Sequence, residues 1–343
     1  MKRPAARARL DGLWRRGCEF LGVEYAILGG AMTWVSERNL VSALSNAGGF
    51  GVIACGAMTP DLLSGEIAAT DGLTSQPYGV NLITLHPELD TLIDVCADHR
   101  VAHVILAGGL PPATAIKRIR GSGARVLCFA PTLAVARRLV RLGADAIVIE
   151  GAEAGGHVGP VATSVLAQEI LPNMDQVPVF VAGGIGRGDA ILGYLELGAS
   201  GCQLGTRFVC ATESIAHPDF KRAFIRANAR DAVTSVQIDP DFPVTPVRAL
   251  QNRGTQEFIE TQRRVIAKVR AGEMAQDEAQ LEIEHFWAGA LRRAVIDGDV
   301  ESGSLMAGQS VGMVVSEQPT AEIIRELFEQ ALAAVEARAG LPE

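Results

Sequence analysis

The chain has 343 residues, of which 48% are hydrophobic and 20% are charged, so it can build a large core and is not expected to be disordered. Its 39 acidic and 31 basic residues give a net charge of −8, and an acidic chain without a long basic run argues against nucleic acid as a partner. It has no uncharged apolar stretch of about 18 residues that would span a membrane and no apolar secretory segment near its N-terminus. We therefore expect a cytoplasmic protein with neither a nucleic-acid nor a membrane partner.

The six cysteines are scattered along the chain, with no Cys-x-x-Cys pair. Several lie in apolar runs, where a free cysteine behaves as a small hydrophobic residue. The histidines lack the His-x-x-His and His-Glu-x-x-His spacings of common metal sites. We therefore expect structural thiols and no metal, with a metal or redox role for the cysteines as the alternative.

Apolar runs typical of buried strands recur through the first two thirds of the chain, at a spacing of roughly 25 residues. They read as continuous apolar segments, which is typical of a parallel sheet that is buried on both faces. Helix-period segments lie between them, for example at residues 36–49, 131–142 and 186–197. The predicted strands are residues 26–30, 51–55, 78–83, 102–107, 125–130, 145–150, 177–182 and 201–205.

Eight strand–helix units predict an α/β fold, a TIM (β/α)8 barrel. A doubly wound open sheet is the alternative, but the first strand ends in Gly29-Gly30-Ala31-Met32, which lacks the usual dinucleotide-binding glycine pattern. Helices are expected over residues 251–291 and 320–339, whereas the prolines of residues 239–246 exclude regular helix there. We predict an N-terminal extension (1–24), a barrel core (25–212) and a mostly helical C-terminal portion (213–343) closing over the barrel mouth.

A glycine-rich segment, residues 150–159, follows the sixth predicted strand. Gly155 and Gly156 carry no Cβ and would let the backbone approach a ligand closely. His157 follows them and could act as a general acid or base, or as a hydrogen-bond donor to a developing anion. A histidine that only stabilises the loop is the alternative. Glu150, at the start of the segment, could cap or orient the loop.

Two further loops follow the seventh and eighth predicted strands, where barrels commonly bind phosphate. They contain Gly183-Gly184 and Gly205-Thr206, which would suit the phosphate of a nucleotide or a flavin, although these glycines could simply form tight turns. Asn81 and Gln203 lie near strand ends and could pair with a heterocycle edge or, alternatively, with neighbouring backbone. Arg207 could bind phosphate or tie the barrel to the C-terminal portion.

These segments together resemble a known family, the FMN-dependent nitronate monooxygenases (2-nitropropane dioxygenases) and the flavin-type enoyl-acyl-carrier-protein reductases. The resemblance extends from about residue 25 to residue 312. It implies a TIM barrel that holds non-covalent FMN at the carboxyl ends of its strands, and it places His157 on the family's essential histidine. The residues expected to contact FMN are Gly30, Ala31, Met32, Asn81, Glu150, Gly155, Gly156, Ala182, Gly183, Gly184, Gln203, Gly205, Thr206 and Gln309.

The resemblance leaves the reaction open between two branches. Segments downstream of residue 213 look more like the enoyl reductases, so reduction of an enoyl thioester by NADH or NADPH is the first hypothesis. Its substrate would be a small molecule or an acyl-carrier-linked chain, and the chain could form a homodimer. Oxidation of alkyl nitronates with O2 is the alternative, and a barrel that binds a phosphorylated ligand without redox chemistry is a remote third. Gly29 and Ala31 depart from the Gln-Gly-Gly-Met usual in the reductases, which bears on the substrate.

Overall fold

A closed barrel of eight parallel strands forms the centre of the molecule. The computed structural model describes residues 3–239, 242 and 245–339. The barrel strands are β1 (Ile27–Gly29), β2 (Gly51–Ala54), β3 (Tyr78–Ile83), β4 (His103–Ala107), β5 (Arg125–Phe129), β6 (Ala146–Glu150), β8 (Val179–Ala182) and β9 (Gly201–Leu204). Neighbouring strands pair in the order β1-β9-β8-β6-β5-β4-β3-β2. A parallel bridge between Leu28 and Phe50 joins the two ends of this order, so the predicted barrel is confirmed and the open-sheet alternative is wrong.

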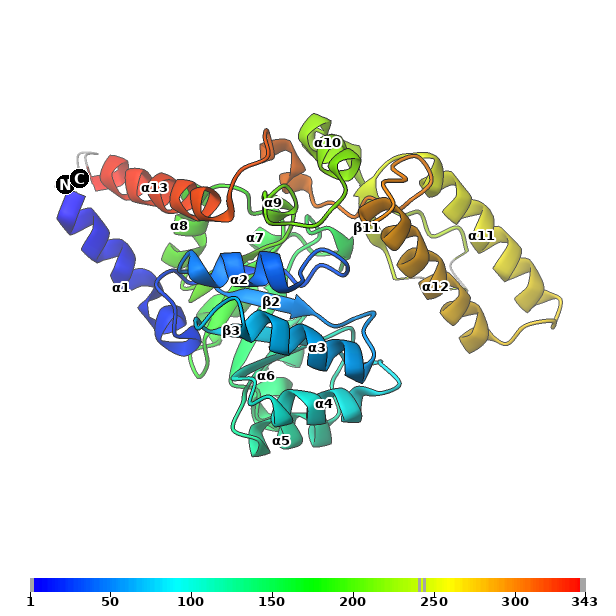
Figure 1. Cartoon of the computed structure of the whole chain (residues 1–343), viewed down its shortest axis with the longest axis horizontal. Coiled ribbons are helices and arrows are strands. Elements are labelled where there is room, and N and C mark those ends of the chain that lie inside the picture. Colours follow the sequence, from blue (N-terminus) through cyan, green and yellow to red (C-terminus); the bar gives the residue numbers. More distant parts are fainter. Residues whose placement is uncertain (1–2, 240–241, 243–244, 340–343) are drawn as a thin grey trace.

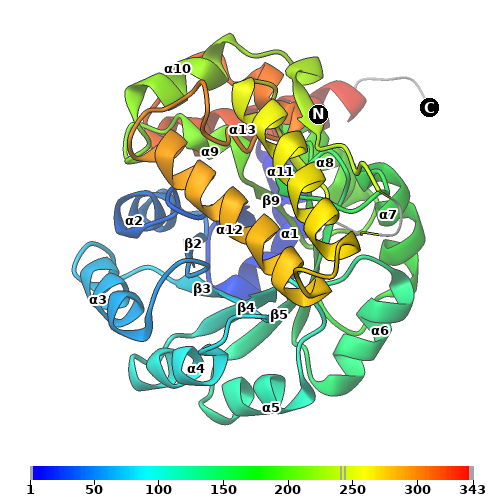
Figure 2. The same cartoon turned by 90° about the vertical axis from the view of Figure 1, so that its right-hand side faces the viewer.

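Helices connect successive strands and surround the barrel (Figure 2). Local capping sets their ends: the Thr132 hydroxyl accepts a hydrogen bond from the backbone N–H of Val135 at the start of α6, and Gly143, with φ of 107°, ends that helix. The predicted helix at residues 131–142 is therefore confirmed. The connecting helices are α2 (Arg38–Asn46), α3 (Pro60–Asp71), α4 (Leu89–Asp98), α5 (Ala113–Gly121), α6 (Leu133–Leu142), α7 (Thr163–Ile170) and α8 (Gly188–Glu196).

The last barrel strand is separated from the last helix by a long insertion. The insertion contains α9 (Thr206–Val209), α10 (Pro218–Arg226), η2 (Ala229–Asp231), β10 (Ala232–Thr234), β11 (Val247–Leu250), α11 (Arg253–Arg270), α12 (Gln276–Val295) and η3 (Gln309–Met313). The chain then returns to the barrel as α13 (Thr320–Ala339), which packs against α8, α2 and the N-terminal helix α1 (Arg3–Leu21) (Figure 1). α13 thus occupies the place of the eighth outer helix, on the outside of the barrel and not over its mouth.

The helices α11 and α12 form an antiparallel pair that extends beyond one end of the barrel. Figure 1 shows strand β2 pointing towards this pair, and Figure 2 shows the pair in front of the strands, so it lies on the side of the strand carboxyl ends. The predicted helical region 251–291 is thus two helices. Of the proline-rich residues 239–246, residues 240–241 and 243–244 lie outside the described part of the chain. The predicted division at residues 24 and 212 stays a prediction.

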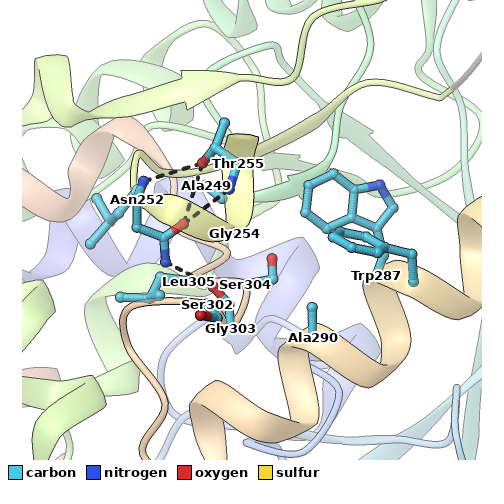
Figure 3. Close-up of a pocket in the computed structure, with 12 residues that line it drawn as sticks. Ala249, Asn252, Gly254, Thr255, Trp287, Ala290, Ser302, Gly303, Ser304 and Leu305 are labelled. Carbon is cyan, nitrogen blue, oxygen red and sulfur yellow. Dashed lines mark hydrogen bonds between the residues drawn. The ribbon is translucent and has the colours of Figure 1, made fainter. Parts of the chain in front are cut away.

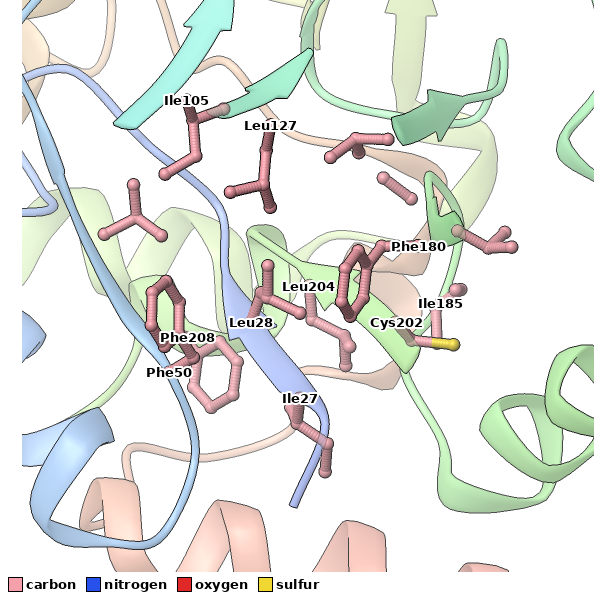
Figure 4. Close-up of a cluster of buried hydrophobic side chains, with 14 of the residues drawn as sticks. Ile27, Leu28, Phe50, Ile105, Leu127, Phe180, Ile185, Cys202, Leu204 and Phe208 are labelled. Atoms are coloured by element: carbon pink, nitrogen blue, oxygen red, sulfur yellow. The ribbon is translucent and has the colours of Figure 1, made fainter. Parts of the chain in front are cut away.

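The core fills the barrel with apolar side chains from strands on different sides. Figure 4 shows Leu28, Ile105, Leu127 and Phe180 gathered between the strands, and all four are buried. At the amino end of the strands, Phe20 of α1 lies 6.2 Å from Phe180, measured between ring centres, and closes the bottom of the barrel. The described helices include none that is long and apolar enough to cross a membrane.

Candidate active site

Three polar side chains share the inner face of the barrel near the carboxyl ends of the strands. In-register residues of parallel strands point to the same side, and so do residues four apart on one strand. Asn81 pairs in register with Ile105, Ile105 with Leu127, and Leu127 with Ala146 on β6. Glu150, four residues after Ala146 on the same strand, pairs with Ala182, which in turn pairs with Gln203. Because Ile105 and Leu127 point into the barrel (Figure 4), Asn81, Glu150 and Gln203 also point inward.

These three side chains have few partners within the protein. The Asn81 amide donates one long hydrogen bond, 3.3 Å, to the carbonyl oxygen of Ile105, so part of its capacity serves the backbone, as the alternative prediction held. The side chains of Glu150 and Gln203 make no hydrogen bond to any residue that the structure describes. Burial raises the pKa of Glu150 to about 8. The barrel mouth therefore presents polar groups with hydrogen-bonding capacity to spare.

Glu153, and not Glu150, holds the glycine-rich loop in place. Its carboxylate accepts hydrogen bonds from the backbone N–H of Thr163 at 2.9 Å and from the hydroxyl of Thr163 at 2.8 Å. The same hydroxyl lies 3.0 Å from the carbonyl oxygen of Gly183 and can share its hydrogen with it. The expectation that Glu150 caps this loop is therefore wrong, because its side chain points into the barrel while Glu153 faces α7.

The glycines after β8 are needed by the turn itself. Gly183 and Gly184 have φ of 99° and 71°, which favour glycine. A Cβ on Gly183 would lie 2.8 Å from the Thr163 hydroxyl, and one on Gly184 would lie 2.8 Å from the Cβ of Glu153. The turn therefore requires glycine at both positions, whether or not a ligand binds there. The backbone N–H of Gly184 nevertheless donates to no residue in the described part of the chain, which leaves it available to an anion.

The loop before η3 is pressed into the glycine-rich segment. A Cβ on Gly155 would lie 2.5 Å from the backbone nitrogen of Gly308, so the close approach at Gly155 is to this loop. The Gly308 N–H donates to the Thr206 hydroxyl at 2.9 Å, and the Gln309 N–H donates to the Glu153 carbonyl oxygen at 2.9 Å. Thr206 retains its own hydroxyl hydrogen for a ligand, and Gln309 is brought to the barrel mouth.

His157 lies in a short strand that the sequence did not indicate. β7 (Gly156–His157) pairs with β11, with His157 opposite Val247, and His157 is exposed. Gly156 has φ of 80°, and a Cβ there would lie 3.6 Å from the Met306 sulfur. Arg248, which sequence reasoning missed, donates to the carbonyl oxygen of Ala152 at 2.9 Å and so fixes the loop before His157. Two-residue strands carry no periodic signal.

The loop after β1 lies against the loop after β9. The backbone N–H of Gly30 donates a hydrogen bond to the carbonyl oxygen of Leu204 at 2.9 Å. In the next loop, a Cβ on Gly205 would lie 3.5 Å from the sulfur of Met32. The Ser36 hydroxyl donates to the Gly30 carbonyl oxygen at 2.7 Å and accepts from the Met32 N–H at 3.0 Å, with half-buried Ala31 between them. These contacts place Gly30, Ala31 and Met32 beside Gly205.

Arg207 ties the barrel to α13. Its side chain is 2% exposed, and it pairs with Glu326 at 2.7 Å and with the Gln318 amide oxygen at 2.9 Å. Of the two predicted roles, the structure therefore favours the link to the C-terminal portion, because the guanidinium points into the α13 interface.

Neither of two hollows in the structure is lined by Asn81, Glu150 or Gln203. A cavity of about 10 Å3 between α11, α12 and residues 302–305 (Figure 3) has room for about one water molecule. In it, the Asn252 side chain bonds to Thr255 and Gly303 at the start of α11. A surface hollow of about 530 Å3 lies beside Gln309 and is also lined by Asn228, Ala229, Arg230, Gly312 and Met313.

The chain is similar to several known proteins. A FabK protein of Thermotoga maritima superposes with a TM-score of 0.84 at 34% identity, covering 95% of this chain and 98% of that chain. A (3aS,4S,5R,7aS)-5-hydroxy-7a-methyl-1-oxo-octahydro-1H-indene-4-carboxyl-CoA dehydrogenase of Mycobacterium tuberculosis is 28% identical over 95% of this chain and 98% of its own. A nitronate monooxygenase of Pseudomonas aeruginosa is 31% identical over 61% of this chain and 72% of its own.

The sequence model of the nitronate monooxygenase family matches residues 16–92 and 88–330. These ranges contain all of the barrel strands and the whole insertion between β9 and α13, so the resemblance inferred from the sequence is confirmed. The chain belongs to the nitronate monooxygenase family and is an oxidoreductase built on a (β/α)8 barrel.

Proposed function

We propose that this enzyme uses FMN, with NADH or NADPH as the hydride donor, to reduce the C=C bond of an enoyl thioester. The observation that carries the proposal is the likeness to FabK, an enoyl-ACP reductase, at 34% identity over 95% of the chain. The dehydrogenase relative from Mycobacterium tuberculosis, which is named for a CoA thioester, matches the same share of the chain. Both point to an acyl thioester, small or carrier-linked, as the substrate class.

The residues at the strand ends fit a flavin mononucleotide. The unbound N–H of Gly184 and the hydroxyl hydrogen of Thr206 would hold the phosphate, because both can donate to an anion. Ala182 and Gln203 are register partners, so Gly184 and Gly205, each two residues further along, lie on adjacent strand ends. The inward amides of Asn81 and Gln203 would meet the heterocycle, together with Gly30, Ala31 and Met32 on one side. Gly155, Gly156 and Gln309 would complete the enclosure.

A bound flavin supplies hydride transfer in this chemistry, and the protein supplies binding and proton handling. His157 is exposed on β7, next to the insertion that carries α11 and α12. An imidazole at this position can donate a hydrogen bond to the thioester carbonyl oxygen, which would stabilise the charge that develops there during reduction. Arg248 supports this role by holding the preceding loop at Ala152.

Nitronate oxidation is the second candidate function. The Pseudomonas aeruginosa nitronate monooxygenase is 31% identical to the chain over 61% of its length, and the barrel and His157 would serve either reaction. A barrel without redox chemistry is disfavoured, because the matched family consists of oxidoreductases.

The test is anaerobic reduction of the flavin-loaded protein in a stopped-flow spectrometer. The flavin absorbance is followed after mixing with NADH, with NADPH and, separately, with propionate 3-nitronate. We expect rapid bleaching by a pyridine nucleotide and reoxidation by crotonyl-CoA. Bleaching by the nitronate alone would reject the reductase in favour of the oxygenase, and a protein that takes up no FMN would reject both.

A further inference from the structure

We propose that the loops after β3 and β4 bind the acyl chain of the substrate through the exposed side chains of Leu85 and Leu110, so that the enzyme prefers medium-chain to short-chain enoyl thioesters. The proposal rests on the proposed function, because it takes the substrate to be an enoyl thioester that is reduced at the barrel mouth. It goes further in naming the part of the mouth that the chain occupies and the residues that select its length.

The loops after β3 and β4 lie across the barrel mouth from the loops after β8 and β9. In the closed order of the strands, three strands separate β3 from β8 in either direction. A flavin phosphate held by Gly184 and Thr206 would therefore lie on one side of the mouth, with the ring extending towards Asn81 of β3 on the other side. A substrate stacked on that ring lies beside the loops after β3 and β4.

An apolar surface leads from Asn81 to the rim of the mouth. Ile83 follows Asn81 by two residues on β3, so it points to the same side of the strand. A Cβ on Gly108, after β4, would lie 3.0 Å from the Ile83 side chain, and a Cβ on Gly109 would lie 3.9 Å from the Cγ of Leu85. The end of β3, its turn and the loop after β4 therefore form one continuous surface.

Two leucines on this rim are exposed to solvent. Leu85 is 81% exposed, more than any other large hydrophobic side chain in the described part of the chain, and Leu110 is 43% exposed. Residues 84–87 and 107–114 include no Asp, Glu, Lys or Arg. Exposed apolar surface beside a site is typical of ligand binding. The acyl chain is the part of the substrate that matches it, because the amides and phosphates of a CoA or carrier arm need polar partners.

Hydrogen bonds fix the turn that presents Leu85. Thr84 donates to the carbonyl oxygen of Ala107 from its backbone N–H at 2.7 Å and from its hydroxyl at 2.8 Å. The backbone N–H of His86 donates to the carbonyl oxygen of Ile83 at 3.0 Å. These bonds hold Leu85 against the loop after β4, so little ordering of the turn is needed when a chain binds.

The experiment compares kcat/KM for octenoyl-CoA and crotonyl-CoA, with a pyridine nucleotide as the donor. Wild type is compared with Leu85→Ser, with Leu110→Ser and with the control Leu197→Ser. Leu197 is 49% exposed and follows α8, at the amino end of the strands. We expect the ratio of the octenoyl value to the crotonyl value to fall about tenfold in Leu85→Ser, because the chain no longer covers an apolar side chain. The fall should be smaller in Leu110→Ser, and the control should keep the wild-type ratio.

Calorimetric titration with octanoyl-CoA and butyryl-CoA, the saturated products, gives a second readout that does not depend on turnover. The longer chain should make the heat capacity change of binding more negative in wild type and in Leu197→Ser, because more apolar surface is buried. This difference between the two ligands should shrink in Leu85→Ser. Circular dichroism verifies that the variants remain folded.

Three results would overturn the proposal. One is a wild-type ratio of octenoyl to crotonyl values in Leu85→Ser. The second is an equal loss with both substrates, which would place the CoA arm on these loops. The third is a change of oligomeric state in Leu85→Ser, which would show that a second copy of the chain covers the rim. If the proposed function itself fails, wild type reduces neither enoyl-CoA, whereas failure of this proposal alone leaves enoyl reduction in place.

Discussion

Replacing Gly155 by alanine is expected to release the loop that brings Gln309 to the barrel mouth. The new Cβ would lie 2.5 Å from the backbone nitrogen of Gly308 and 2.6 Å from the carbonyl carbon of Ala307. These are backbone atoms of an ordered loop, so they cannot rotate away as a flexible side chain could. The loop must move as a whole, and its contacts with the barrel must break.

The magnitude follows from the contacts that would be lost. Two hydrogen bonds anchor this loop: Gly308 N–H to the Thr206 hydroxyl, and Gln309 N–H to the Glu153 carbonyl oxygen, each 2.9 Å long. Each contributes about 1 kcal/mol, and crowding of a packed site adds about 1–3 kcal/mol where the loop cannot withdraw fully. We therefore expect the free energy of unfolding to fall by roughly 2–4 kcal/mol.

The assay is equilibrium unfolding in urea, together with the FMN affinity of each variant. Gly159→Ala is the matched control, since it lies in the same segment and a Cβ there would meet nothing within 4 Å. It should change stability by less than about 0.5 kcal/mol. We also expect weaker FMN binding by Gly155→Ala alone. Equal stability of the two variants would refute the close packing between the glycine-rich segment and the loop before η3.

Four further changes test other parts of the site and its scaffold. His157→Ala should keep bound flavin yet lose most turnover, and a colourless protein would instead assign this exposed residue to cofactor binding. Gly205→Ala has room for its Cβ, which would lie 3.5 Å from the nearest atom, so we expect unchanged stability but weaker FMN retention; unaltered retention would remove this glycine from the phosphate site. Gly188→Ala should destabilise the fold by about 2 kcal/mol or more, because its Cβ would overlap the backbone of α13. Gly193→Ala, in the same helix, is the control: its Cβ would meet nothing within 4 Å, so this change should be neutral or stabilising. Similar melting temperatures of the two variants would contradict the packing of α13 against α8. Arg207→Leu should lower the free energy of unfolding by about 1.5–3 kcal/mol, since the buried guanidinium loses its hydrogen bonds to the half-exposed carboxylate of Glu326 and to Gln318, and a urea midpoint equal to wild type would show that these contacts are dispensable.

Local patterns were enough to predict the barrel. Each of the eight strands lies within its predicted segment, and the last helix has the predicted bounds, Thr320–Ala339. This succeeded because buried parallel strands are continuous apolar runs, and outer helices carry a 3.6-residue period with local caps. The tight turn at Gly183 and Gly184 after β8 was also among the sequence predictions, because a positive φ at a strand end favours glycine whatever the rest of the fold.

The remaining features depend on contacts between segments far apart in the chain. The pairing of β7 with β11 places His157 opposite Val247, and the two residues of β7 are too few to show a period or an apolar run. The sequence alone could not show which of Glu150 and Glu153 holds the glycine-rich loop, because both lie beside the same glycines. The pleat of β6 points the Glu150 side chain into the barrel, whereas the Glu153 carboxylate binds Thr163 at the start of α7. The chain thus determined by itself which segments are strands and helices, where local spacing and capping are sufficient. Only the tertiary structure decided which side chains meet at the barrel mouth, because that depends on the closure of the sheet and the return of α13 across more than a hundred residues.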